Sequence, residues 1–497
     1  MRRVIYIMSI ALSSVFSACT DWLTITPETT VVAENLLTTN EGVQEALNGT
    51  YILLRNVYGP ESTMGGTGLA ETLAATWKTS EGSSEYMLAT HKYNIEDNGI
   101  GGALNSTFQG LYNIVANLNP LIEGITENRS KLDVEVYNIV KGEALAIRAC
   151  VHLDLIRLWG PMPSKVNDAK EYLPYVIHNT TAKYTYLTYG KYMEMLFVDL
   201  DEAERLLKES DPILEYPANN TIQSYSKWTK RQSHFNYYGV LGLKARALLW
   251  NGDTEEALRY ARMIKDAKNT DGTPKFRLAN DSDFENLADG MWDATFYPEH
   301  LCGVSVENYD YQKGAYAATS QSAFMDYGVY PVPDNWMVFT MTVFDNNTND
   351  LRVKQQWYWN YSNKTGLYPP NYKMVFPRKY NGISPTSKSG IQNMPVMRLA
   401  EVYLMIAEHA PLSEANEVYE EFCEARNINR VELTDANRDE KILKEWIREL
   451  MAEGQNFFTY KRKAVERMLI MFPEEASNCG ETEYVLPLPP KEYMNEY

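Results

Sequence analysis

Aromatic side chains in two stretches of the sequence are the groups most able to bind a ligand. A sugar ring presents apolar CH faces bordered by hydroxyl groups, so a sugar site needs flat rings together with amide and carboxylate partners. Tyr and Trp offer large rigid surfaces with few rotatable bonds. Residues 61–102 and 281–395 contain both kinds of group. The candidate ligand-binding residues are Trp77, Tyr86, Trp292, Tyr309, Tyr311 and Tyr316, with Tyr93 and Tyr297 in the same set and Asn308, Asp310, Gln312 and Lys313 nearby.

The competing interpretation is that these rings pack the two stretches against the rest of the protein. With 35 Tyr in the chain, some of them must do so. Trp357 and Trp359 would share one face of a strand, which suits a core position as well as a site, and Trp336 lies at an expected helix start. Loops longer than about 15 residues are usually functional or disordered, and the many aromatics argue against disorder. We therefore expect ordered surface excursions that contain a few short strands.

Catalytic motifs are absent from the sequence. There is no GxSxG elbow, no HExxH and no phosphate-binding glycine loop. The acidic run at residues 345–350 lacks the Gly and Glu of a calcium loop, which favours a polar turn over a metal site. The histidines, including His152 and His409 in strongly helical stretches, suit packing. We predict a binding protein with no cofactor and no metal, although a glycoside hydrolase needs only two suitably placed carboxylates.

The N-terminus resembles a lipoprotein secretion signal. Arg2 and Arg3 precede a short apolar run that ends in small residues just before Cys19. The run is well short of the roughly 20 residues that span a bilayer. We expect residues 1–18 to be removed and Cys19 to carry lipid, the alternative being an ordinary signal peptide with a cysteine nearby.

Composition limits the possible partners. The net charge of −18 and the absence of basic clusters argue against nucleic acid, because phosphate binding requires Lys and Arg. No low-complexity linker divides residues 19–497, so we expect one large domain. The other cysteines are scattered, which leaves one or two disulfides possible, and Cys150 suits a helix core.

Helical periodicity dominates the rest of the chain. Apolar residues recur at three- and four-residue spacings within residues 42–57, 108–125, 134–159, 191–207, 237–249, 254–264, 396–409, 413–426 and 442–463. Residues 240–265 form the clearest pair, with small residues Ala245, Ala257 and Ala261 around a turn at Gly252. This layout is typical of a tetratricopeptide unit, and a second pair covers residues 397–427. We predict a mainly α fold in which a tetratricopeptide-like scaffold carries an irregular, loop-rich ligand region with minor β structure.

Four segments resemble the SusD/RagB family. Residues 142–161 have the form E-A-x-x-x-R-A followed by D-L-x-R-x-x-G, where Glu143 and Arg148 stand at motif positions. Residues 395–408 are similar to the family's P-x-x-R-x-A-E-x-Y-L helix, with Arg398 and Glu401. Residues 448–462 resemble a late helix whose Gly454 allows a close approach, and residues 484–489 resemble the C-terminal signature. The four occur in the family's order along nearly the whole mature chain.

The resemblance implies a lipoprotein, anchored in the outer membrane, that captures oligosaccharide or peptide over a SusC-like TonB-dependent transporter. The sequence does not separate sugar from peptide, and a protein-binding scaffold is a further alternative. Glu143, Arg148, Arg398 and Glu401 lie at helical spacing, so we interpret them as ion pairs that hold the fold. Replacing Arg398 with Ala should therefore lower the melting temperature and leave ligand affinity of the folded fraction intact.

Overall fold

Helices predominate because most segments repeat apolar side chains with the period of an α-helix. The computed structural model confirms the mainly α fold. Among the described helices, none combines the length and apolar character needed to cross a bilayer. The structure describes residues 36–60, 62–66, 68–76, 83–92, 94–219, 228–285, 294–306, 343–359, 375–377, 379, 393–468 and 479–489.

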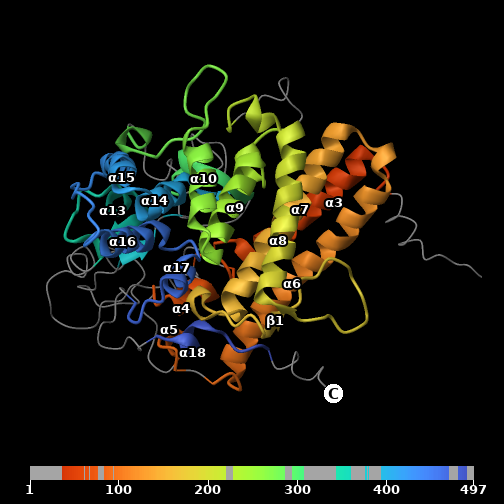
Figure 1. Cartoon of the computed structure of the whole chain (residues 1–497), viewed down its shortest axis with the longest axis horizontal. Helices are drawn as coiled ribbons and strands as arrows, with labels where there is room; N and C mark the ends of the chain where they lie inside the picture. Colours follow the sequence, from red (N-terminus) through yellow and green to blue (C-terminus); the bar gives the residue numbers. More distant parts are fainter. Residues whose placement is uncertain are drawn as a thin grey trace, which may run out of the picture.

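The first half of the scaffold surrounds helix α7 (Val134–Trp159), which is buried along almost its whole length. Helices α3 (Asn40–Tyr58), α6 (Asn98–Glu127) and α8 (Tyr189–Ser210) pack against it (Figure 1). Side chains cap the N-termini of α3 and α6. Thr39 accepts a hydrogen bond from Gly42 N, and Asp97 accepts hydrogen bonds from Gly99 N and Ile100 N. The expected helices at residues 42–57, 108–125, 134–159 and 191–207 are all present, three of them longer than predicted.

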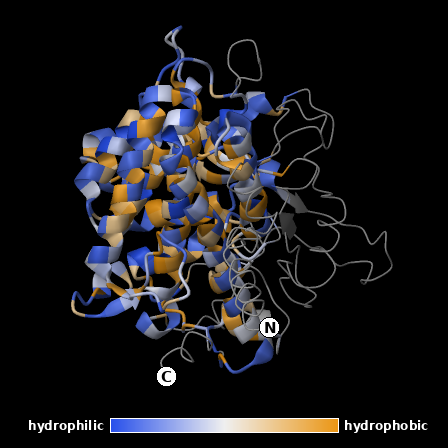
Figure 2. Ribbon diagram, turned by 90° about the vertical axis from the view of Figure 1, so that its right-hand side faces the viewer, coloured by the Kyte–Doolittle hydropathy of each residue, from blue (hydrophilic) through white to orange (hydrophobic). Residues whose placement is uncertain are grey.

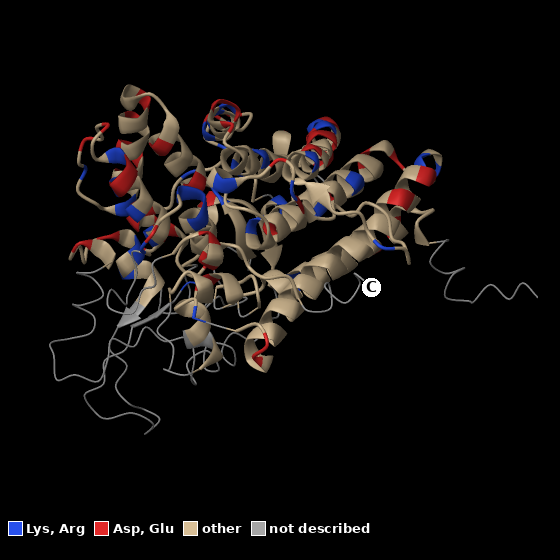
Figure 3. Cartoon of the chain, turned by 60° about the horizontal axis from the view of Figure 1, so that its bottom comes forward, with Lys and Arg blue, Asp and Glu red and all other residues tan. Residues whose placement is uncertain are grey.

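Two helical hairpins follow, as the sequence predicted. Helix α9 (Tyr237–Asn251) ends at Gly252, whose φ of 86° is left-handed, and α10 (Thr254–Lys265) packs back against it. Helices α14 (Leu399–His409) and α15 (Leu412–Arg426) form the second hairpin, and α10 packs against α14. Hydrophobic and hydrophilic residues are interspersed along the helices of the scaffold (Figure 2), and charged residues of both signs are spread over the helices (Figure 3).

The expected single helix at residues 442–463 is wrong. The structure has α16 (Arg438–Leu450) and α17 (Asn456–Lys463), separated by a turn at residues 451–455. Ala452 and Gly454 adopt left-handed φ values of 63° and 70° there, which a continuous helix does not allow. A Cβ on Gly454 would lie 2.3 Å from the carbonyl oxygen of Met64, so the turn also depends on a close approach of two backbones.

Within the described residues, three two-stranded antiparallel sheets complete the fold. They pair β1 (Glu171–Leu173) with β2 (Leu187–Thr188), β3 (His300–Ser305) with β6 (Asn393–Arg398), and β4 (Trp357–Trp359) with β5 (Val375–Pro377). His300 lies opposite Arg398 in the β3–β6 register. The helix expected from residue 396 therefore begins only at Leu399, because the preceding residues pair as a strand. Short strands in the second excursion are confirmed.

The first excursion differs from the expected surface loop. Helix α4 (Leu69–Leu73) is buried at every residue, and α5 (Ser84–Ala89) follows it. Within the described residues of 61–102 there is no strand. The segment is drawn inward because Leu69, Ala70 and Leu73 join the main cluster of buried apolar side chains, which extends from Val43 to Leu486.

Several smaller features lie outside the helical hairpins and the sheets. Residues 345–350 form a polar turn before α13 (Leu351–Gln356), where Asp350 accepts a hydrogen bond from Arg352 N. Over the described ranges, no group of three metal-ligating side chains occurs. Cys150 is buried on α7, as predicted. Finally, α18 (Glu481–Tyr484) lies near the C-terminus.

Candidate functional site

The predicted ligand-binding rings lie beyond the part of the chain that the structure describes. Trp77, Trp292, Tyr309, Tyr311 and Tyr316 fall outside the described residues, as do Tyr93, Trp336 and the lipid-attachment residue Cys19. So do the neighbouring polar residues Asn308, Asp310, Gln312 and Lys313. Tyr86 belongs to α5, but its side chain is not described, and the same holds for Trp359 in β4. These assignments remain predictions.

Two aromatic residues from the same stretches belong to the packed interior. Tyr297 is 8% exposed and its ring meets the His300 ring edge-on, with centroids 5.6 Å apart. Trp357 is 3% exposed within the main apolar cluster. The packing interpretation therefore holds for these two rings.

The described residues show where the first excursion is fixed. Glu71 in α4 lies six positions before Trp77 and is fully buried. Its Oε1 atom accepts hydrogen bonds from Gly454 N (2.8 Å) and Glu453 N (3.2 Å), in the turn between α16 and α17. Burial raises the pKa of Glu71 to about 7, although the bonds from Thr76 and Gly454 and the nearby Lys379 oppose this shift.

The second excursion is fixed at the same turn. Arg398, the last residue of β6, donates through Nη1 to Glu299 Oε2 (2.9 Å) and to Glu449 Oε1 (2.8 Å). Its Nη2 atom donates to Glu453 Oε1 (2.7 Å). Lys379 Nζ donates to the carbonyl oxygens of Glu449 (2.9 Å) and Met451 (2.8 Å) and to Glu453 Oε1 (2.5 Å).

Further buried charges extend this cluster toward α13 and α15. Arg426 donates to Glu299 and Glu449, and Arg352 donates to Glu449 across 3.3 Å. Burial by itself raises the pKa of Glu449, but Arg426 and Arg398 outweigh that effect and hold it well below its usual range. We call this set of side chains the root network; it consists of Glu71, Glu299, Arg352, Lys379, Arg398, Arg426, Glu449 and Glu453.

The root network brings together the ends of both excursions. Glu71 precedes the undescribed residues 77–82, and Glu299 follows residues 286–293. Lys379 and Arg398 flank residues 380–392. All four are joined through the backbone or side chains of residues 449–454. The chain segments that lead to Trp77 and Trp292 therefore start from one place on the scaffold.

The motif residues form ion pairs that connect helices, which confirms their structural interpretation. Arg148 pairs with Asp199 on α8 (2.7 Å), and Glu401 pairs with Arg246 on α9 (2.7 Å). Glu143 accepts from Arg231 Nη1 (2.5 Å), and Arg231 Nη2 pairs with Asp211 (2.8 Å). Burial opposes ionisation of Glu143, yet Arg231 and His234 lower its pKa to about 2.

The buried histidines have packing roles. His152 Nδ1 lies 2.8 Å from the Tyr192 hydroxyl, and burial lowers the His152 pKa to about 3. Burial likewise lowers the pKa of His300 to about 4, and its Nε2 lies 3.0 Å from the Thr295 carbonyl oxygen. Both rings are neutral near pH 7, which fits hydrogen bonding within a core.

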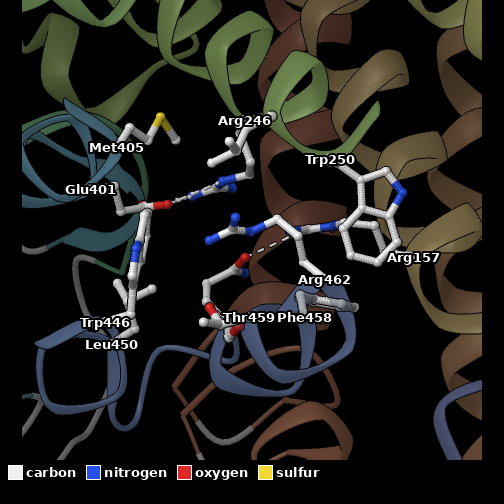
Figure 4. Close-up of a pocket in the computed structure, with 12 residues that line it drawn as sticks. Arg157, Arg246, Trp250, Glu401, Met405, Trp446, Leu450, Phe458, Thr459 and Arg462 are labelled. Atoms are coloured by element: carbon white, nitrogen blue, oxygen red, sulfur yellow. Dashed lines mark hydrogen bonds and ion pairs between the residues drawn. The ribbon is translucent and has the colours of Figure 1, made fainter. Parts of the chain in front are cut away.

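One small cavity lies within the scaffold, beside the turn at residues 451–455 (Figure 4). Its volume is about 30 Å³, enough for about two water molecules and too small for a sugar ring. Arg157, Arg246 and Arg462 line it together with Glu401. The cavity is therefore too small to be the predicted glycan site.

Sequence reasoning missed the root network, although one signal was available. Glu71 stands in the run Leu69–Ala70–Glu71–Thr72–Leu73, where a single acid among mainly apolar residues indicates a buried, paired carboxylate. Its partner Gly454 lies 383 positions further along the chain, and local periodicity carries no information over that distance.

Comparisons with known proteins agree with this fold. A sequence model described as "SusD family" matches residues 225–486, and one described as "Starch-binding associating with outer membrane" matches residues 22–226. No curated protein matches the chain. Among solved structures, a SusD superfamily protein from Bacteroides thetaiotaomicron is 19% identical with a TM-score of 0.66, covering 92% of this chain and 98% of that one.

Two further structures have informative names. A putative sugar binding protein from Bacteroides vulgatus is 20% identical with a TM-score of 0.63, covering 91% of this chain and 96% of that one. A laminarin binding SusD-like protein is 15% identical with a TM-score of 0.60 and the same two coverages, 91% and 96%. At such identities these structures share the fold. Because the family's own model matches more than half of the sequence, the chain belongs to the SusD family.

Proposed function

We propose that this protein captures oligosaccharide at the outer membrane and delivers it to a SusC-like TonB-dependent transporter. Family membership supports the outer-membrane setting, and a protein of the same fold is named for binding laminarin. Cys19 holds the protein at the surface through lipid, and import is powered by the transporter. The protein itself binds the sugar without turning it over.

The observation that carries the proposal is the common root of the two excursions. Glu71 and Arg398 both bind Glu453 in the turn between α16 and α17, although Glu71 belongs to the first excursion and Arg398 directly follows the second. Aromatic rings displayed from one region of the scaffold can contact the same sugar chain, because such a chain is bound by several stacking surfaces at once. The Trp77 and Trp292 rings then form parts of a single glycan surface, with the amides and carboxylates of residues 308–313 at its edge.

Affinity electrophoresis against laminarin, starch and other polysaccharides tests this surface. Trp77→Ala and Trp292→Ala should each weaken retardation in the responsive gel by about tenfold or more, as expected for a central aromatic contact. Tyr184→Ala is the matched control, because Tyr184 lies on the scaffold and packs only at the edge of the core. It should bind as the wild type does.

Unchanged binding in both Trp variants would remove these two rings from the site. If no polysaccharide retards the wild type, mass spectrometry of material eluted from native protein distinguishes a peptide cargo. The appearance of new reducing ends during incubation with oligosaccharide would overturn the non-catalytic part of the proposal.

The anchor and the partner are tested in cells. Globomycin blocks lipoprotein processing and should leave the precursor uncut, and Cys19→Ala should release the protein from the membrane fraction. A transporter of the TonB-dependent class should co-purify with the wild type. Processing that is insensitive to globomycin would indicate an ordinary signal peptide instead.

A further inference from the structure

The arginine-lined cavity lies between α7, in the first half of the scaffold, and helices that follow it in the chain. Arg157 belongs to α7 and Arg246 to α9, whereas Arg462 belongs to α17. Glu401 of α14 lines it as well. The close-up shows these side chains converging on one space between α9 and α17 (Figure 4). Nothing in the proposed capture of glycan uses this place.

The cavity is rich in hydrogen-bond donors. Arg157 Nε is buried and has no hydrogen-bond partner among the described residues, and the whole residue is only 3% exposed. Arg246 uses Nε and Nη2 on Glu401 and the Val396 carbonyl oxygen, which leaves Nη1 without a bond to a described residue. Arg462 binds Glu408 through Nη1 and Nη2, which leaves its Nε available.

Acceptors around the same space are few. Both carboxylate oxygens of Glu401 already receive bonds from Arg246, and Arg398 N also approaches Oε1. Gln455 Oε1 accepts from Arg157 Nη2 (3.2 Å). A water molecule would accept from the free N–H groups, but it must also place two hydrogens of its own. A group that only accepts hydrogen bonds suits the cavity better than water does.

The local charge favours the same kind of occupant. Three guanidinium groups and one carboxylate line the cavity. Asp154 and Glu408, which pair with Arg157 and Arg462, are not among the lining residues. An anion in the cavity would thus meet guanidinium groups first. The volume of about 30 Å³ limits it to a small ion.

We propose that the cavity between α9 and α17 is a binding site for one monovalent anion of the size of chloride. The anion accepts hydrogen bonds from N–H groups of α7, α9 and α17 and so connects these helices. This inference does not depend on glycan binding, and its failure would leave the proposed function untouched.

Melting temperatures measured at constant ionic strength test the site, with sodium chloride replaced stepwise by sodium gluconate, whose anion is too large to enter. Chloride should produce a saturable rise of about 2 °C, as expected for a ligand that binds only the folded state. Thr459→Met is the matched variant, because Thr459 lines the cavity and takes part in none of the three ion pairs. The longer side chain should abolish the chloride effect.

Crystals soaked in bromide provide a readout that does not require the variant to fold. An anomalous peak within hydrogen-bond distance of Arg157 Nε and Arg246 Nη1 is expected. Equal melting temperatures in chloride and gluconate would overturn the proposal. So would a chloride effect that persists in Thr459→Met, or a cavity that holds water and no bromide.

Discussion

Buried charges are organised differently in the helical scaffold and in the root network. In the scaffold they form separate ties between two or three elements, such as Arg148 with Asp199 and Arg246 with Glu401. In the root network one side chain serves many partners, and Arg398 alone contacts Glu299, Glu449 and Glu453. The scaffold thus owes its order to repeating apolar contacts, whereas the root network owes its order to buried charges that each share several partners.

Three left-handed residues lie close to the root network, although others occur elsewhere, for example at His91 and Lys230. Ala75 (φ 52°), Phe296 (φ 60°) and Ala452 (φ 63°) are left-handed and lie within four residues of Glu71, Glu299 and Glu453, respectively. Within the described helices of the scaffold, left-handed residues occur only at the ends, for example Asn427 after α15. A strained backbone conformation persists only where contacts with surrounding residues hold it in place. The root network supplies such contacts, close to the chain segments that lead to the proposed ligand surface.

Removing Arg398 should produce the largest difference between the two regions. Arg398→Ala leaves Glu299, Glu449 and Glu453 buried without this partner, and breaking a buried ion pair costs about 3–5 kcal/mol. The free energy of unfolding, measured in urea, should fall by that amount. The glycan affinity of the folded fraction should stay unchanged, because Arg398 is fully buried and holds the fold.

Arg205→Ala is the control for this experiment. Arg205 pairs with Glu202 and Glu209 on the surface of α8 and its side chain is 52% exposed. Exposed pairs contribute at most about 1 kcal/mol. If both variants lost similar stability, the contrast between the two regions would disappear. A loss of affinity without a loss of stability in Arg398→Ala would instead make Arg398 a ligand residue.

Glu71 should give the root network a pH dependence of its own. Its pKa is raised by burial from 4.5 to about 7, so the folded state binds a proton more tightly than the unfolded state does. The resulting stability is fully present below pH 4.5 and is lost as pH rises through about 7. Glu71→Gln keeps an acceptor for Gly454 N and stays neutral, so this variant should lack that loss.

The comparison of the two proteins isolates this effect from other carboxylates. Above pH 7 the Glu71→Gln variant should be more stable than the wild type by up to about 3 kcal/mol, and below pH 4.5 the two should be similar. Thermal unfolding across this range measures the difference. Glu194→Gln on the surface of α8 should show no such trend. A constant difference at all pH values would mean that the pKa of Glu71 is the same in the folded and unfolded states.

The scaffold was readily predicted because its information is local. The period of apolar residues gave α7 its limits at residues 134 and 159, and Gly252 correctly marked the turn between α9 and α10. The strand at residues 393–398 was missed because its pairing with β3 joins residues about a hundred positions apart, such as His300 and Arg398. Alternation in so short a segment does not distinguish a strand from the first turn of a helix.

The root network could not be predicted from any window of the sequence. Ala452 is left-handed in the structure, yet alanine favours helices and gives no sign of a turn. Arg398 and Glu401 were correctly interpreted as structural, but their partners Glu299, Glu449 and Arg246 come from distant segments. The ligand rings stay predictions. What the structure adds is the common origin of the segments that carry them.

The smallest expected effect concerns the strained turn, where glycine should act in opposite directions in the two regions. An L-residue in the left-handed region costs about 1 kcal/mol of stability, and Ala452→Gly removes this cost. Glycine also gives the unfolded chain more conformational freedom, which lowers stability by about 0.5–1 kcal/mol. The net change should therefore lie between zero and a gain of about 0.5 kcal/mol. Ala247 is fully buried in the middle of α9. Ala247→Gly relieves no backbone strain; it adds freedom to the unfolded chain and removes a packed methyl group. The free energy of unfolding should therefore fall by about 1 kcal/mol or more. Urea midpoints of the two variants with equal slopes measure the contrast, and an equal loss in both would mean that the contacts of the Ala452 methyl group outweigh its backbone strain.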